Sequence, residues 1–90
     1  MAYEQQAEVR NKEGLHFRPI MRLVDLASQF VAAITIQGNE RQADARSPME
    51  LLMLVATTGT KLKISAAGAD ERDAVDALVR LIESGFDEKQ

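Results

Sequence analysis

A single histidine, His16, stands where a glycine-containing loop meets a predicted helix, within Gly14-Leu15-His16-Phe17-Arg18-Pro19. Imidazole is a good nucleophile near neutral pH, because the unperturbed imidazolium has a pKa of about 6.5 and much of the ring is therefore neutral at pH 7. The start of a helix presents backbone N–H groups without partners and a partial positive charge. That charge attracts an anion and disfavours an imidazolium. His16 is therefore a candidate nucleophile beside an anion-binding site.

The neighbours of His16 suit such a site. The Arg18 guanidinium can hold phosphate oxygens through two parallel hydrogen bonds, and the backbone N–H groups of Phe17 and Arg18 belong to the first turn. Pro19 loses no helical hydrogen bond there, and Gly14 permits a close approach of the chain and an unusual φ. A histidine at a helix start is also often a cap or a partly buried ring. The residues alone leave both interpretations open.

Composition narrows the classes of protein. The 90 residues predict one domain, residues 1–90, and 46% hydrophobic with 28% charged residues is typical of a soluble globular chain. The chain has no cysteine and a net charge of −3 without a basic block, which argues against disulfides and nucleic-acid binding. The N-terminus lacks a signal-peptide pattern, and the longest apolar run is far too short for a membrane span. We expect a cytoplasmic protein without metal or cofactor.

The hydrophobic pattern predicts an alternation of elements. Strands are expected at residues 3–10, 30–37, 40–45 and 61–67. Helices are expected from Phe17 onward, at residues 47–56 and at residues 70–84, followed by a charged tail from Phe86 to Gln90. The order β-α-β-β-α-β-α, with one apolar face per element, predicts an α+β fold. In it, an antiparallel sheet carries the helices on one face.

Three stretches resemble the HPr family, the histidine-containing phosphocarriers of the bacterial sugar phosphotransferase system. They are residues 14–19, residues 63–71, and Ser47 after Arg46. The resemblance spans roughly residues 3–85 with no evident gap. It implies an open-faced β-sandwich of four antiparallel strands under three helices. It also implies that His16 is phosphorylated through Nδ1 and that Arg18 steadies the phosphoryl group.

The resemblance further implies partners. The donor would be enzyme I, charged by phosphoenolpyruvate, and the acceptors would be enzyme IIA domains of sugar-specific permeases. We expect a monomeric carrier with a transient phosphohistidine, rather than a free-standing enzyme. Two other functions stay open: metabolic signalling through the same phosphohistidine, and a protein-binding module without covalent chemistry on the same fold.

Several residues depart from the family pattern. Phe17 and Ile20 stand where the family prefers small residues, and Asp25 lowers the positive charge of the expected docking face. Pro48 and Glu50 replace an apolar residue and a glycine after the regulatory serine. These departures leave the identity of the partners and the regulation by serine phosphorylation open.

Ser47 has two interpretations. The resemblance makes it a candidate site for HPr kinase/phosphorylase, whereas Ser47-Pro48-Met49-Glu50 has the pattern of a capping box. We favour the cap. For Asp70, Glu71 and Asp73, we favour acidic residues at a helix start over a metal site.

Helical spacing cannot bury all the apolar residues of the predicted second helix, which are Met49, Leu51, Leu52, Met53, Leu54 and Val55. We therefore expect at least Met49 and Met53 to be partly exposed. The candidate docking residues for partner proteins are Phe17, Met21, Met49, Leu52 and Met53.

Overall fold

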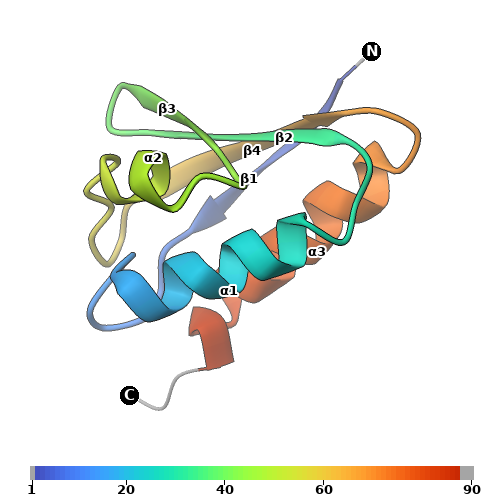
Figure 1. Cartoon of the computed structure of the whole chain (residues 1–90). Helices are drawn as coiled ribbons and strands as arrows, with labels where there is room; N and C mark the ends of the chain where they lie inside the picture. The colour runs from blue at the N-terminus through green and yellow to red at the C-terminus, as the bar shows by residue number, and fades with distance from the viewer. Residues whose placement is uncertain (1, 88–90) are drawn as a thin grey trace.

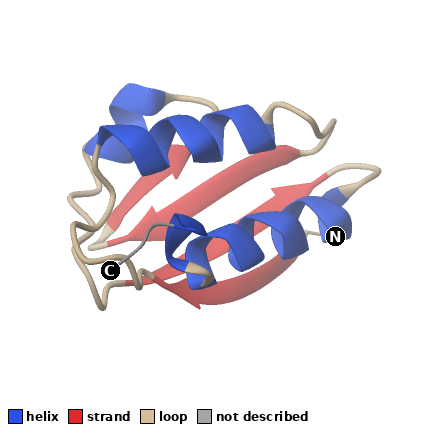
Figure 2. Cartoon of the chain, turned by 90° about the horizontal axis from the view of Figure 1, so that it is seen from below, coloured by secondary structure: helices blue, strands red, loops and turns tan. Residues whose placement is uncertain are grey.

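Four alternating segments form one antiparallel sheet in the computed structural model, which describes residues 2–87 (Figure 1). The strands are β1 (Tyr3–Glu8), β2 (Ala33–Gly38), β3 (Arg41–Asp44) and β4 (Lys61–Ala67), in the spatial order β1-β4-β2-β3. The helices α1 (Phe17–Ala27), α2 (Pro48–Leu52) and α3 (Glu71–Glu83) cover one face and leave the other open (Figure 2). The predicted α+β open-faced β-sandwich is confirmed.

The core lies between the sheet and the helices. Every second side chain of the inner strands points toward the helices, and Ile36 of β2 faces Ile64 of β4 across the ladder. Burying such side chains stabilises each by roughly 1.5–3 kcal/mol relative to exposure. The helices contribute buried residues from one stripe each, chiefly Ile20, Leu23, Ala27, Ala74, Val75, Leu78 and Ile82. The inward-facing side chains of β2 and β4 are all buried, namely Ile34, Ile36, Leu62, Ile64 and Ala66.

Two element boundaries differ from the prediction by three residues or more, and the others differ by at most two. Helix α2 ends at Leu52 instead of residue 56, because the chain turns into a left-handed conformation at Val55 (φ 51°). Strand β2 starts at Ala33 instead of residue 30, because the turn after α1 continues with a hydrogen bond from the Phe30 N–H to the Ala27 oxygen. Within residues 2–87, no helix is long and apolar enough to cross a bilayer.

Phe86 does not belong to a charged tail, so that prediction is wrong at this position. Its ring is fully buried in the core, and residues Gly85–Asp87 form a short 3-10 turn, η1. Gly85 (φ 71°) turns the chain back, and Arg22 of α1 donates a hydrogen bond to the Phe86 carbonyl oxygen. The aromatic ring therefore closes the helical side of the core. Residues 88–90 of the predicted tail lie outside the described residues.

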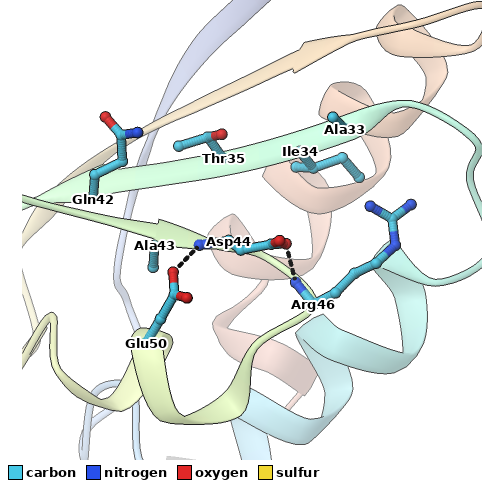
Figure 3. Close-up of a pocket in the computed structure, with 8 residues that line it drawn as sticks. All are labelled: Ala33, Ile34, Thr35, Gln42, Ala43, Asp44, Arg46 and Glu50. Atoms are coloured by element: carbon cyan, nitrogen blue, oxygen red, sulfur yellow. Dashed lines mark hydrogen bonds between the residues drawn. The ribbon is translucent and has the colours of Figure 1, made fainter.

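On each edge strand of the sheet, β1 and β3, one backbone N–H group donates a hydrogen bond to a glutamate side chain. Glu83 of α3 accepts hydrogen bonds from the Glu8 N–H of β1 and from Arg10 Nε, both at 2.6 Å. These bonds, that from Glu8 first, hold the pKa of the Glu83 carboxyl below its usual range. Glu50 accepts from the Asp44 N–H of β3 at 2.9 Å (Figure 3). N–H groups engaged in this way cannot pair with a strand of another chain.

Candidate functional site

His16 occupies the N-cap position of α1, with extended backbone angles (φ −98°, ψ −170°). Its carbonyl oxygen accepts the first helical hydrogen bond, from the Ile20 N–H at 3.1 Å, and its own N–H donates to the Gly14 oxygen at 3.0 Å. The imidazole makes no capping bond to the helix and is partly exposed. The backbone thus holds His16 in place, and the ring does not serve as the cap of α1.

The first turn of α1 presents donors rather than acceptors beside His16. The Phe17 and Arg18 N–H groups precede the first i to i−4 bond of the helix, and Pro19 has no N–H. Arg18 is exposed, and the turn contains no acidic residue. An anion carried by the imidazole would lie at the positive end of the helix dipole, near two backbone donors, and Arg18 is exposed two residues along the chain.

The loop before His16 is braced against the segment that follows α2, and the two run side by side at one end of the molecule (Figure 1). The Leu15 N–H donates to the Ala56 oxygen at 2.8 Å. Gly14 has φ 70°, and a Cβ at this position would lie 2.5 Å from the Ala56 oxygen and 2.9 Å from the Thr57 Cα. The expectation that a glycine is required here for a close approach and an unusual φ is confirmed.

Two polar residues without a recognisable motif, Asn11 and Thr58, complete this brace. Asn11 is fully buried, and its Nδ2 donates to the Gly14 oxygen at 2.6 Å. The Thr58 hydroxyl donates to the carbonyl oxygens of Asn11 and, at 2.8 Å, Lys12. Asparagine and threonine are common in loops, so their types alone do not predict hydrogen bonds between residues 11–14 and the segment after α2. Together they fix the backbone that leads into His16.

Ser47 lies at the far end of α2 from this brace, at the N-cap. Its Oγ accepts from the Glu50 N–H at 3.3 Å, as a capping serine does, and its own N–H donates to the Asp44 oxygen at 3.0 Å. The second half of the predicted capping box is wrong, because the Glu50 carboxylate turns to the Asp44 N–H instead of Ser47 (Figure 3). The Ser47 N–H already donates to the Asp44 oxygen, so it has a partner other than this carboxylate.

A shallow depression of about 340 Å³ adjoins this turn, between β2, β3 and the start of α2 (Figure 3). Its charged residues already have partners within the chain. The Arg46 N–H donates to the Asp44 carboxylate at 2.9 Å, and the Arg46 guanidinium donates to the carbonyl oxygens of Phe30 and Ala32. The charged side chains that line the depression therefore stabilise the turn around Ser47.

Asp70 occupies the N-cap position of α3, and Glu71 and Asp73 lie in its first turn, so the helix-start interpretation of these three residues is confirmed. The Asp70 side chain makes no capping hydrogen bond to α3. The Asp70 carboxylate instead accepts from the Val31 and Ala32 N–H groups, both at 2.8 Å, in the segment between α1 and β2. These hydrogen bonds lower the pKa of the Asp70 carboxyl, and the bond from Val31 has the largest effect. Glu71 accepts from the Gly68 N–H at 3.1 Å, so both carboxylates hold the turn into α3.

An exposed apolar surface, here called the α2 patch, lies on α2 and the residues after it. The expectation that Met49 and Met53 are exposed is confirmed. Leu52 is also exposed, and Phe17, next to His16 on α1, is 75% exposed. Met21 is only partly exposed. The α2 patch consists of Met49, Leu52, Met53 and Val55.

Comparisons with known proteins agree with this geometry. A family model described as the PTS HPr component phosphorylation site matches residues 3–84. Phosphocarrier protein NPr of Proteus mirabilis is 39% identical over 89 residues, covering 98% of this chain and 99% of the relative. Phosphocarrier protein HPr of Cupriavidus necator is 39% identical over 85 residues, covering 94% and 96%. The crystal structure of HPr-C-His from Thermoanaerobacter tengcongensis superposes with a TM-score of 0.92 at 40% identity, covering 98% and 99%.

Proposed function

Because the chain belongs to the HPr family of phosphotransferase-system phosphocarriers, we propose that His16 accepts a phosphoryl group from one protein and passes it to another. In the first step, the lone pair of the His16 Nδ1 attacks the phosphorus atom, and an N–P bond forms. The bond from phosphorus to the donor's leaving atom breaks, and its electron pair returns to the donor. The second step reverses these roles, with His16 as the leaving group.

The local backbone at His16 is the observation that carries this proposal. An imidazole that does not cap α1 stands beside two N–H donors of the first turn and one exposed guanidinium. These groups favour the negative charge that a phosphoryl group brings. The brace from the segment after α2 keeps the loop in one conformation, so little ordering is required when a partner arrives.

We assign the donor role to enzyme I, charged by phosphoenolpyruvate, and the acceptor role to enzyme IIA domains in sugar uptake. The family supports this assignment through its phosphotransferase system, and the exposed α2 patch beside the loop supplies apolar surface for docking. In this proposal residues 1–90 act as one monomeric, cytoplasmic domain that carries the group while its partners supply most of the catalysis.

The test is phosphorylation by a bacterial enzyme I with phosphoenolpyruvate, followed by intact-mass measurement. The wild type should gain one phosphoryl group that is labile in acid and stable in alkali, as a phosphoramidate is. The His16→Ala variant should gain none while melting at the wild-type temperature. Acid-labile phosphate on the His16→Ala variant would exclude His16 as the site.

A further inference from the structure

Asn11 is the one polar residue that is buried among residues 2–87, and it is fully enclosed. A buried amide costs free energy unless it finds hydrogen-bond partners. The Asn11 Nδ2 donates to the Gly14 oxygen at 2.6 Å, just before His16 in the chain. A leucine has a similar shape and would fill this part of the core without needing a partner. The amide therefore serves the turn that leads into His16 rather than the packing.

The Gly14 carbonyl oxygen is a shared acceptor. It receives the Asn11 Nδ2 and, at 3.0 Å, the His16 N–H. The Gly14 N–H in turn donates to the Asn11 oxygen at 3.1 Å, so two hydrogen bonds between Asn11 and Gly14 close this turn. Because the His16 N–H and the Asn11 amide meet at one oxygen, displacement of the amide would move the peptide that holds His16.

Two further segments contact Asn11. The Thr58 hydroxyl, in the segment after α2, donates to the Asn11 oxygen. A Cβ added to Gly85 would lie 3.7 Å from the Asn11 nitrogen and 3.8 Å from its Cα, so the start of η1 lies close to the Asn11 main chain. Asn11 therefore has little freedom to move, and its amide holds the Gly14 peptide from the interior of the protein.

We propose that Asn11 is a positioning residue for phosphoryl transfer, which acts through the Gly14 carbonyl and the main chain of His16. The inference rests on the proposed function. In phosphoryl transfer the attacking and leaving atoms lie in line with phosphorus, so a small displacement of the nucleophile slows the reaction steeply. His16 is the nucleophile in the first step and the leaving group in the second. Loss of its positioning should therefore slow both steps.

The decisive variant is Asn11→Leu, which keeps a similar shape and removes the Nδ2 donor. It should remain folded, because an apolar group of similar shape is tolerated in a core. The kcat for charging by enzyme I and the maximal rate of transfer to an enzyme IIA domain should both fall about 10-fold. Both KM values should stay within about 2-fold of the wild type, because a buried residue cannot contact a partner. Hydrogen exchange at the His16 N–H should become faster.

Gln5→Leu is the matched control, because the Gln5 Nε2 donates to the Asp76 carboxylate at 2.9 Å, between β1 and α3. It also replaces an amide that makes a hydrogen bond, but away from the turn before His16, and should leave both rates unchanged. Equal losses of rate in Gln5→Leu and Asn11→Leu would make the effect one of general stability and would refute the inference.

A folded Asn11→Leu variant with the wild-type kcat would overturn the inference, and so would a raised KM at unchanged kcat or an effect confined to one step. If Asn11→Leu fails to fold, Thr58→Val tests the same turn from an exposed position. It should lower both rates about 2–5-fold, and Thr58→Ser should restore them. Unchanged rates in Thr58→Val would refute the inference as well. Failure of the wild type to take up phosphate would instead overturn the proposed function, so the two failures are distinguishable.

Discussion

At the scale of single residues, the phosphoryl transfer proposed for His16 requires a partly exposed imidazole on a backbone that is held in place. The N-cap carbonyl is used by the helix, and the ring is not. Such a separation lets one residue position itself through its main chain and react through its side chain. The sequence points to His16 because it is the only histidine of the chain, and to Gly14 and Arg18 because they lie beside it at a predicted helix start. It did not identify Asn11 or Thr58, whose hydrogen bonds join loops about 46 or 47 residues apart in the chain.

Arg18→Ala should slow phosphoryl transfer without unfolding the protein. The side chain is exposed, so its removal costs little packing. A hydrogen bond to a charged group contributes roughly 1.5–3 kcal/mol, which corresponds to about 10–100-fold in rate if the contact is made in the transition state. Rapid-quench transfer rates and matched thermal melts measure both effects.

Arg41→Ala on β3 is the control for the loss of one exposed positive charge. It should leave the rate near that of the wild type. Equal rates in the Arg18→Ala variant and the wild type would remove Arg18 from the site. A large fall in melting temperature would make its role structural.

At the scale of elements, the start of α2 determines how Ser47 behaves. The Ser47 Oγ caps the Glu50 N–H, and the Glu50 carboxylate is held by the Asp44 N–H on the edge strand. Pro48 fixes φ directly after the serine. The turn is thus constrained on both sides of the hydroxyl, and a phosphate there would be repelled by the nearby carboxylate.

Ser47 should be a poor substrate for HPr kinase, and Ser47→Ala should lower the free energy of unfolding by about 0.5–2 kcal/mol, as lost caps do. Phosphoryl transfer through His16 should stay almost unchanged, because Ser47 lies at the opposite end of α2. Kinase and ATP treatment with mass-spectrometric mapping tests the first part, and urea unfolding tests the second. Stoichiometric phosphate on Ser47 would restore the regulatory interpretation.

Asp70→Asn should destabilise the protein at pH 7, and its melting temperature should fall less than that of the wild type as the pH is lowered. The folded-state pKa of Asp70 lies below the ordinary value for an aspartate, because the charged form accepts N–H bonds from Val31 and Ala32. A lowered folded-state pKa contributes stability above the unfolded-state pKa, and the contribution is lost as pH falls through the folded value. The melting temperatures of variant and wild type should therefore differ at pH 7 and converge below about pH 4.

Asp73→Asn, also in the first turn of α3, controls for the loss of negative charge at a helix start. Its melting temperature should follow the wild-type pH profile more closely than Asp70→Asn does. A constant difference between Asp70→Asn and the wild type from pH 7 to pH 3 would contradict the role assigned to the carboxylate.

At the scale of the whole molecule, local pattern predicts the elements better than their ends. The alternation in β4 and the stripe of α1 are visible in sequence because each follows one period. The early end of α2 could not be predicted from the local pattern. It involves hydrogen bonds from Asn39 and Leu15, which are distant in the chain, to the carbonyl oxygens of residues 54–56. The strand order β1-β4-β2-β3 is likewise a property of the assembled sheet, and only the family resemblance implied an arrangement of this kind.

Phe86 shows how one aromatic residue near a chain end can belong to the core. Phe86→Ala should lower the free energy of unfolding by about 3–5 kcal/mol, since the variant leaves a cavity where a ring was fully buried. Phe17→Ala is the matched control: its ring is 75% exposed, and its loss should change stability by less than about 0.5 kcal/mol. Urea unfolding of both variants measures the difference. Equal stability of the two would contradict the burial of Phe86.

The open face of the sheet offers a site for attachment. Lys61 and Lys63 project from β4 on the side away from the helices, whereas His16 begins α1 on the covered side. Because the chain contains no cysteine, Lys63→Cys would create a single thiol there. A protein immobilised on an electrode or bead through that thiol would keep α1 and His16 on the side away from the support. Such a surface would let the proposed phosphorylation of His16 be tested on anchored molecules, with enzyme I supplied in the flowing solution.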